Sequence, residues 1–229
     1  MKAASVINLR ELSSCHKCGH KDHNIICSVS SDVLALLDAA KIKTTYKPHQ
    51  TIFYQGNDPL GLYTVSEGLV KLEAVSESGQ AHTVRYVGAG HAIGYQSLFT
   101  NEKYNVSATT VESSIVCFIP KNVVMDIFSK FPMASFQIMK ALSEDLKLAD
   151  SKWTDQMDKD VPQRVAEAII YLQDHFEHQN WTRKEIAEWA GTTPESVIRT
   201  LAQFEKAGFI DQTEGRNIKI LNRCGLMNK

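Results

Sequence analysis

Residues 181–210 read WTRKEIAEWAGTTPESVIRTLAQFEKAGFI, and they predict two short amphipathic helices joined by a tight turn. Thr182 and Glu185 have the spacing of a capping box, in which two side chains satisfy free backbone groups at a helix start. Gly191 is expected to end this helix, because glycine readily adopts the left-handed conformation of a C-cap. Thr193, which precedes a proline, is expected to cap the second helix. The pattern is the signature of a helix-turn-helix.

The flanking segments extend this motif into a domain over residues 159–229. Upstream, PQRVAEAIIYLQDHF (162–176) predicts a helix with one apolar face, and its proline suits a first helical turn. Downstream, IDQTEGRNIKIL (210–221) predicts a hairpin that turns at Glu214–Gly215. A hairpin in this place is typical of the winged variant of the motif.

Residues 132–158 are expected to form one long helix that joins two copies of the chain. Apolar side chains recur at alternating spacings of three and four, which is the seam of a coiled coil. The expected dimerisation residues are Met139, Leu142, Leu146, Ala149 and Trp153. The alternative is an ordinary core helix that packs on its own domain.

Residues 32–131 predict an antiparallel β-roll that begins with a short helix over residues 33–40. Short β-rich runs such as LYTVSEG and LVKLEAV alternate with glycine-containing turns. With the helical segments that follow, the expected fold class is α+β.

Residues 1–31 form a Cys/His-rich arm that we expect to be loosely structured. It contains Cys15, Cys18 and Cys27 together with His16, His20 and His23. The chain has five cysteines in all, and an odd number argues against a disulfide framework. Zinc is one interpretation of the cluster, with the three cysteines and either His20 or His23 as tetrahedral ligands.

Composition excludes several classes of protein. The formal net charge is −1, so contact with nucleic acid would require basic groups gathered on one face. No apolar run approaches the roughly 18 residues of a membrane span, and the N-terminus lacks a secretory core, so a cytoplasmic location is expected. No catalytic motif is present, and we expect no enzyme.

The order of roll, long heptad helix and winged helix-turn-helix resembles the cyclic-AMP-receptor/FNR superfamily of bacterial transcription regulators. The resemblance covers roughly residues 33–221. It is most specific in FYQGNDPLGLYTVSEGLVKL (53–72), VGAGHAIGYQSLF (87–99) and TTPESVIRTLAQFEKAGFI (192–210). It implies a homodimer that binds a pseudo-palindromic site in double-stranded DNA, with RNA polymerase as a further partner. The sequence does not distinguish an activator from a repressor.

The resemblance implies that Glu195 and Arg199 read base edges. Residues four apart lie on one helical face, so both side chains reach the same major groove. Arginine donates twice to a guanine edge, and glutamate accepts from a cytosine amino group. The alternative is a surface ion pair. The expected phosphate contacts are Thr192, Thr193, Ser196, Lys184 and Arg216.

The resemblance suggests two kinds of signal that the first part of the chain could sense: a small ligand bound in the roll, or an oxidant that acts on an iron–sulfur cluster. Family members that bind cyclic nucleotides use a Glu and an Arg-Ser pair, where this chain has Tyr95, Asn105 and Val106. The missing cation and hydroxyl argue against cyclic AMP, although another small ligand in the roll stays open. The oxygen-sensing branch holds a [4Fe-4S] cluster, and the ligands implied here are Cys15, Cys18, Cys27 and Cys117. Three further interpretations stay open: zinc, a site without metal in which Cys117 is a buried strand residue, and a ligand- or redox-binding module without DNA binding.

Overall fold

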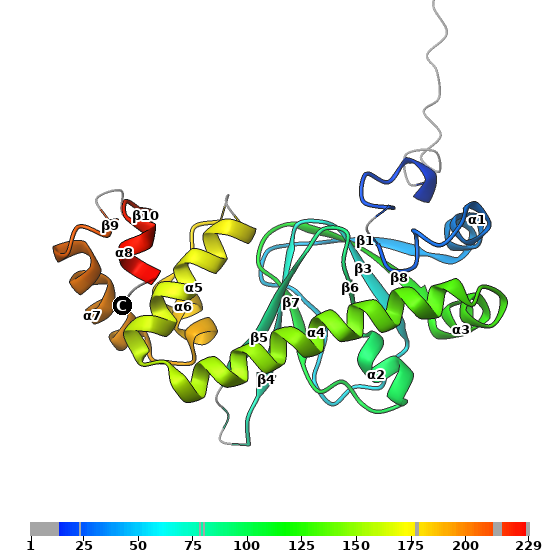
Figure 1. Ribbon diagram of the computed structural model, residues 1–229. Helices are drawn as coiled ribbons and strands as arrows, with labels where there is room; N and C mark the ends of the chain where they lie inside the picture. The colour runs from blue at the N-terminus through cyan, green and yellow to red at the C-terminus, as the bar shows by residue number, and fades with distance from the viewer. Residues whose placement is uncertain are drawn as a thin grey trace, which may run out of the picture. The chain divides into compact units, whose positions relative to one another are not determined.

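The computed structural model describes residues 14–22, 24–77, 79, 81–176, 179–212 and 217–227. The chain divides into two compact units (Figure 1). The first comprises residues 14–75 and 84–145, and the second comprises residues 76–83 and 146–227.

The first unit is the expected β-roll with helices. Its helical elements are η2 (Cys15–Lys17), α1 (Ser31–Ala40), α2 (Tyr95–Thr100), α3 (Lys121–Lys130) and the first half of α4 (Met133–Asp158). Its strands are β1 (Ile42–Tyr46), β2 (Thr51–Phe53), β3 (Gly61–Glu67), β4 (Leu69–Val75), most of β5 (Ala81–Gly88), β6 (Ala92–Ile93), β7 (Ser107–Thr110) and β8 (Ser114–Pro120).

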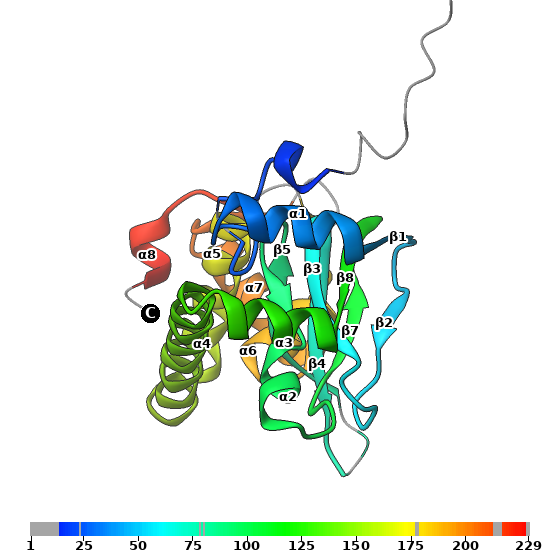
Figure 2. The same ribbon diagram turned by 90° about the vertical axis from the view of Figure 1, so that its right-hand side faces the viewer.

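The strands form two four-stranded sheets, in the orders β1-β8-β3-β6 and β2-β7-β4-β5, which lie as two layers (Figure 2). In the first sheet β8 pairs antiparallel with both β1 and β3. In the second sheet β7 pairs antiparallel with both β2 and β4. The α+β class and the roll are therefore confirmed.

Gly68 shows why one turn of the roll requires glycine. It joins β3 to β4 with a φ of +88°, a conformation that other residues rarely adopt. A Cβ atom there would also lie 2.4 Å from the Ser114 hydroxyl oxygen. Any side chain at this position would therefore both strain the backbone and push β8 away.

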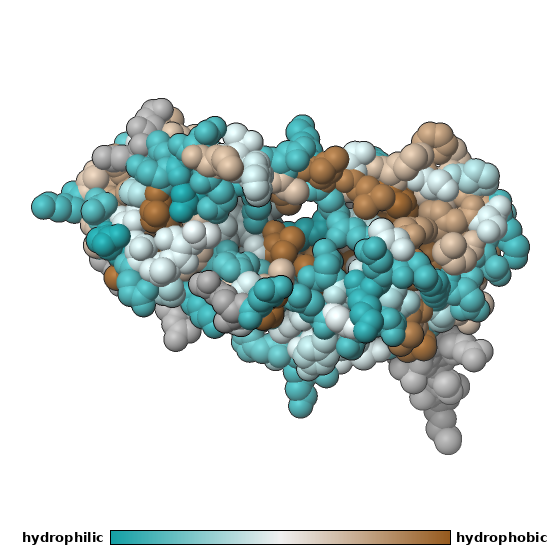
Figure 3. Space-filling model, turned by 90° about the horizontal axis from the view of Figure 1, so that it is seen from below, coloured by the Kyte–Doolittle hydropathy of each residue, from teal (hydrophilic) through white to brown (hydrophobic). Residues whose placement is uncertain are grey.

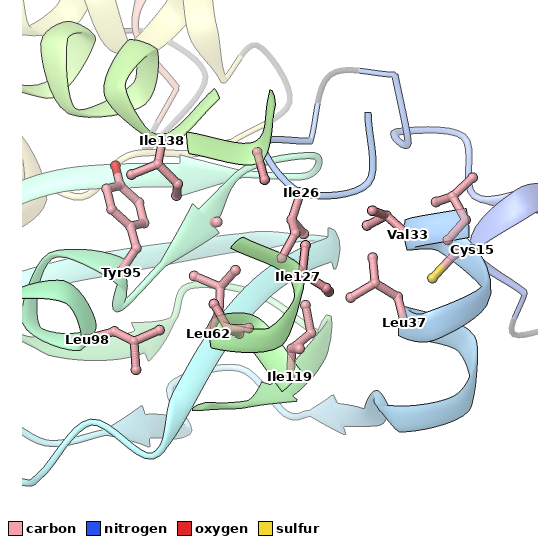
Figure 4. Close-up of a cluster of buried hydrophobic side chains, with 14 residues drawn as sticks. Cys15, Ile26, Val33, Leu37, Leu62, Tyr95, Leu98, Ile119, Ile127 and Ile138 are labelled. Carbon is pink, nitrogen blue, oxygen red and sulfur yellow. The ribbon is translucent and has the colours of Figure 1, made fainter. Parts of the chain in front are cut away.

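The described part of the arm is packed, so the expectation that it is loosely structured is wrong for residues 14–22 and 24–30. Ile26 has no exposed surface and Cys15 is buried, and both belong to the main core of the first unit. That core also contains Leu37 of α1 and Ala134 and Ile138 of α4 (Figure 4). The sequence shows little apolar periodicity in this segment, but tertiary contacts bury Cys15 and Ile26.

The second unit contains the rest of α4, followed by the elements of the expected winged domain. They are α5 (Val161–His175), α6 (Arg183–Ala190), α7 (Pro194–Lys206), β9 (Ile210–Asp211), β10 (Lys219–Ile220) and α8 (Arg223–Met227). The strands β9 and β10 pair antiparallel, as the predicted hairpin requires, whereas its turn at Glu214–Gly215 lies outside the described residues. Among the helices described, none is long and apolar enough to cross a membrane.

Candidate nucleic-acid interface and cysteine site

The ends of α6 and the start of α7 are fixed by the predicted caps. The Thr182 backbone N–H donates to the Glu185 carboxylate at 2.8 Å, and the Glu185 N–H donates to the Thr182 hydroxyl at 3.2 Å. Gly191 ends α6 with a φ of +62°, and the Thr193 hydroxyl accepts from the Ser196 N–H at 3.3 Å. These contacts set the turn between α6 and α7, and the helix-turn-helix is confirmed.

The two faces of α7 differ sharply. Val197, Leu201 and Phe204 are buried against α5 and α6. Glu195 and Arg199 lie on the opposite face and are exposed. Hydrogen bonds from its own backbone N–H and from Thr193 lower the pKa of Glu195, so its carboxylate is a ready acceptor. The buried face therefore fixes α7 to the domain, while the opposite face exposes the charged groups of Glu195 and Arg199.

Ile198 was not singled out from the sequence, yet 56% of its surface is exposed beside this pair. An apolar side chain on the exposed face of such a helix suits contact with a thymine methyl group. The signal was available in the sequence, because Ile198 falls between Glu195 and Arg199 and off the buried stripe.

Three of the five expected phosphate contacts lie around the start of α7, namely Thr192, Thr193 and Ser196. Thr193 and Ser196 are engaged with each other in the cap, their hydroxyl oxygens being 3.3 Å apart, while Thr192 is half-buried in the turn. Lys184 is exposed on α6, with its ammonium 3.8 Å from the Glu188 carboxylate. Arg216 lies outside the described residues.

The four cysteines expected to bind a cluster line one cavity of about 220 Å³ in the first unit. Cys15 belongs to η2 and Cys18 follows it, while Cys117 comes from β8, far away in the sequence. Cys27 is placed by Asn24, a buried residue whose side-chain oxygen accepts from the Cys27 N–H at 3.2 Å. The Asn24 amide donates in turn to the Gly90 carbonyl at 3.1 Å. The loop between Cys18 and Cys27 is thus held against the roll.

The thiols of this cavity influence one another. A hydrogen bond with Cys27 and another from Lys41 lower the pKa of Cys15. The same bond to Cys15, together with burial, raises the pKa of Cys27. Burial raises the pKa of Cys117. The surroundings of Cys15 therefore favour its thiolate form, whereas those of Cys27 and Cys117 disfavour theirs.

Lys41 and Asp38 are residues of this site that the sequence analysis missed. The Lys41 ammonium lies 2.9 Å from the Cys15 sulfur and 2.7 Å from the Asp38 carboxylate. Against the opposing effect of burial, hydrogen bonds from Lys41 and from the Cys15 N–H lower the pKa of Asp38 to about 2. An Asp and a Lys at i, i+3 spacing near a helix end carry no signal of their own in the sequence, because such pairs are common on helix surfaces.

The donor set fits an iron–sulfur cluster. Four cysteines from the arm and the roll surround one cavity, and four thiolates are the ligand set that such clusters take. Within the described part of the chain, no three His, Cys, Asp or Glu side chains come close enough to hold a single metal ion. A cluster is larger than one ion and its ligands lie farther apart. Of the histidines considered for zinc, His20 lines the cavity, and His23 lies outside the described residues.

The interior of the roll is filled by side chains. The rings of Phe53 and Tyr104 stack with centroids 3.9 Å apart, and Tyr63 lies beside Phe53. Tyr95, at the position of the nucleotide-binding Glu, is buried and donates to Asp145 of α4. Asn105 is exposed and Val106 is partly buried. No cation or hydroxyl at the last two positions is available to meet a phosphate.

The apolar stripe of α4 is largely uncovered. Met139, Leu146 and Trp153 are 51%, 62% and 69% exposed, and Leu142 and Ala149 are exposed between them. The buried residues of this helix are Ala134 and Ile138, which precede the stripe near the start of α4. Apolar side chains are visible at the molecular surface among hydrophilic ones in Figure 3. Monomeric proteins rarely expose a continuous row of large apolar residues.

Comparisons with known proteins agree with this architecture. The family model of the cyclic nucleotide-binding domain matches residues 43–131, and that of the Crp-like helix-turn-helix domain matches residues 163–229. The fumarate and nitrate reduction regulatory protein of Vibrio cholerae is 27% identical over 187 residues, which are 78% of this chain and 74% of that protein. The regulatory protein HlyX of Actinobacillus pleuropneumoniae is 26% identical over 217 residues, which are 90% of this chain and 89% of that protein. A CRP/FNR-family transcriptional regulator from Thermus thermophilus superposes with a TM-score of 0.69 at 26% identity, covering 82% of this chain and 97% of that one.

Proposed function

Since the chain belongs to the cyclic-AMP-receptor/FNR superfamily of DNA-binding transcription regulators, we propose that it binds a pseudo-palindromic DNA site as a homodimer and is switched by an iron–sulfur cluster. It is a regulator and not an enzyme. The convergence of four cysteines from distant segments on one cavity carries the second part of this proposal.

The DNA-reading surface is the exposed face of α7. Arg199 donates to a guanine, Glu195 accepts from a cytosine, and Ile198 contacts a thymine methyl group. The hydroxyl groups at the turn and Lys184 at the start of α6 hold phosphates, and we extend this role to Arg216. Since phosphate contacts release counterions, affinity for a DNA site should fall steeply and linearly on a log–log scale as salt rises. Binding that is insensitive to salt would contradict a DNA-binding role for this face.

The homodimer is formed by the stripe on α4. Met139, Leu142, Leu146, Ala149 and Trp153 recur with coiled-coil spacing and are exposed in the single chain, so a second copy of the helix covers them. A two-fold dimer places its α7 helices in successive major grooves, which requires half-sites about one helical turn apart. RNA polymerase is the partner through which such a dimer affects transcription.

The cluster is held by Cys15, Cys18, Cys27 and Cys117. When bound, it supplies a group whose state depends on oxidants. The protein's part is to hold four thiolates, to exclude solvent by packing the arm on the roll, and to connect the site to α4. The core that contains Cys15 and Ile26 also contains Ala134 and Ile138 of α4, so the arm and the dimerisation helix share buried contacts (Figure 4).

Anaerobic purification followed by absorption spectroscopy and analysis of iron and sulfide tests the cluster. We expect absorption near 400 nm, about four iron atoms per chain, and loss of both in Cys117→Ala. Cys224→Ala is the matched control, because Cys224 is exposed and lies far from the cavity in the sequence. Colourless protein without iron, prepared without oxygen, would exclude the cluster, and stoichiometric zinc would establish a zinc site in its place.

A further inference from the structure

A buried lysine lies inside the cysteine site. Lys41 directly follows α1, and only 8% of its side chain is exposed. Its ammonium donates to the Cys15 sulfur at 2.9 Å and to the Asp38 carboxylate at 2.7 Å. A lysine is rarely buried to this extent unless a negative group meets it, because desolvating an ammonium is costly.

The Asp38 carboxylate compensates only part of the positive charge of the buried Lys41 ammonium. This carboxylate also accepts from the Cys15 N–H at 2.6 Å and from the Ser14 hydroxyl at 2.9 Å, so it is shared among several donors. The Lys41 ammonium also donates to the Cys15 sulfur. Lys41 thus contacts the Cys15 side chain and Asp38 accepts from its backbone N–H, and both contacts hold Cys15 at the end of α1.

We propose that Lys41 is a positioning residue that raises the reduction potential of the cluster held by the four cysteines. This inference rests on the proposed function. Hydrogen bonds to ligand sulfurs and nearby net charge are among the main determinants of the potential of an iron–sulfur cluster. Reduction adds one electron to a site that is already anionic, and the Lys41 ammonium offsets part of the added charge.

Asp38 acts in the opposite direction in the same cavity. Its carboxylate adds a negative charge close to Cys15, which disfavours a further electron. The two residues therefore make opposite electrostatic contributions, although both hold the arm in place. This difference separates an electrostatic role from a purely structural one, since a packing defect would affect both variants alike.

An anaerobic redox titration of the whole protein with dithionite as the electron donor, followed by visible and electron paramagnetic resonance spectra, tests the inference. At a fixed potential, we expect Lys41→Met to lower the ratio of reduced to oxidised cluster about tenfold, or ~59 mV for one electron. Asp38→Asn should raise this ratio. Lys43→Met is the matched control, because Lys43 lines the same cavity but is exposed, and its change should stay under about threefold.

The outcomes are distinguishable from failure of the proposed function. Wild-type protein that takes up no iron refutes the cluster itself. Wild-type protein with a cluster whose potential changes no more in Lys41→Met than in Lys43→Met refutes only the role of Lys41. If Lys41→Met assembles no cluster, the test rests on Asp38→Asn. The inference is overturned if the reduction potential of the cluster in Asp38→Asn is not higher than in the wild type.

Discussion

Replacing Asp145 by alanine should destabilise the first unit strongly, although Asp145 lies on α4 and resembles the other acidic residues of that helix. Its carboxylate accepts from the Arg85 guanidinium and from the Tyr95 hydroxyl, and it accepts from the Gln96 amide at 3.1 Å. Arg85 also donates to the Tyr95 hydroxyl at 3.2 Å. Four side chains from β5, α2 and α4 therefore form one network around a single carboxylate.

The size of the effect follows from burial. The side chains of Asp145 and Arg85 are 15% and 18% exposed. Removing one partner of a fully buried pair costs about 3–5 kcal/mol, because the other charge is left desolvated without compensation. Some solvent reaches Arg85, so we expect a loss of about 2–3 kcal/mol. Asp145→Asn, which keeps an acceptor of the same shape, should lose less.

Urea unfolding can assign this loss to the first unit. All three tryptophans, Trp153, Trp181 and Trp189, belong to the second unit, so fluorescence reports that unit alone. Circular dichroism reports both units. With a urea m-value of about 2 kcal/mol/M, the dichroism midpoint should fall by roughly 1–1.5 M while the fluorescence midpoint changes less.

Asp150→Ala is the matched control, since Asp150 is an exposed acidic residue on the same helix. Its effect should stay within about 0.5 kcal/mol. All variants are compared at one protein concentration, because dimerisation adds to apparent stability. If Asp145→Ala shifts the dichroism midpoint no further than Asp150→Ala does, the carboxylate does not hold these elements together.

Three further changes have defined outcomes. Arg199→Ala should weaken discrimination at one base pair by about 1–3 kcal/mol and leave the dimer intact, as measured by competition with single-base variants of a selected site. Leu146→Asp should convert the dimer to monomers in sedimentation, because it places a charge in the exposed stripe, whereas Lys147→Asp on the charged face should not. Burial lowers the pKa of Lys152 to about 8, although its ammonium lies 3.2 Å from the Trp189 ring centre. The ammonium therefore destabilises the second unit, whose unfolding free energy should rise between pH 8 and 10.5, and Lys152→Met should abolish this rise while fluorescence-detected unfolding stays cooperative.

The helix-turn-helix could be predicted from the sequence almost residue by residue, because its boundaries are local. A capping box, a C-terminal glycine and a Thr-Pro start each act within four residues. The β-roll was predictable for a related reason, since alternation and glycine turns recur along the chain. Its strand order was not, because β8 lies between β1 and β3 through contacts that span most of the unit.

The packing of the arm could not be predicted, and the reason is physical. Cys15 has polar neighbours and Ile26 belongs to the short run Ile25–Ile26–Cys27, which is too short to show a periodicity that would indicate burial. They are buried because α1, β8 and α4 together create a core that accepts them. Lys41 escaped notice for the same reason, since its importance depends on Cys15, which is far from it in the sequence.

The shared core also explains how a change at the cysteines would reach α4. Protein interiors are close-packed, so a buried side chain cannot leave without its neighbours relaxing. Cys15 and Ile26 lie in one core cluster with Ala134 and Ile138, the buried residues near the start of α4 (Figure 4). Met139 and Leu142, which follow Ile138 within about one helical turn, are exposed and begin the proposed dimer seam. If the arm detached when its thiolates lost their common partner, Ala134 and Ile138 would lose packing next to the proposed dimer seam. Such a switch would need no further element, because α4 contributes both to this core and to the proposed seam.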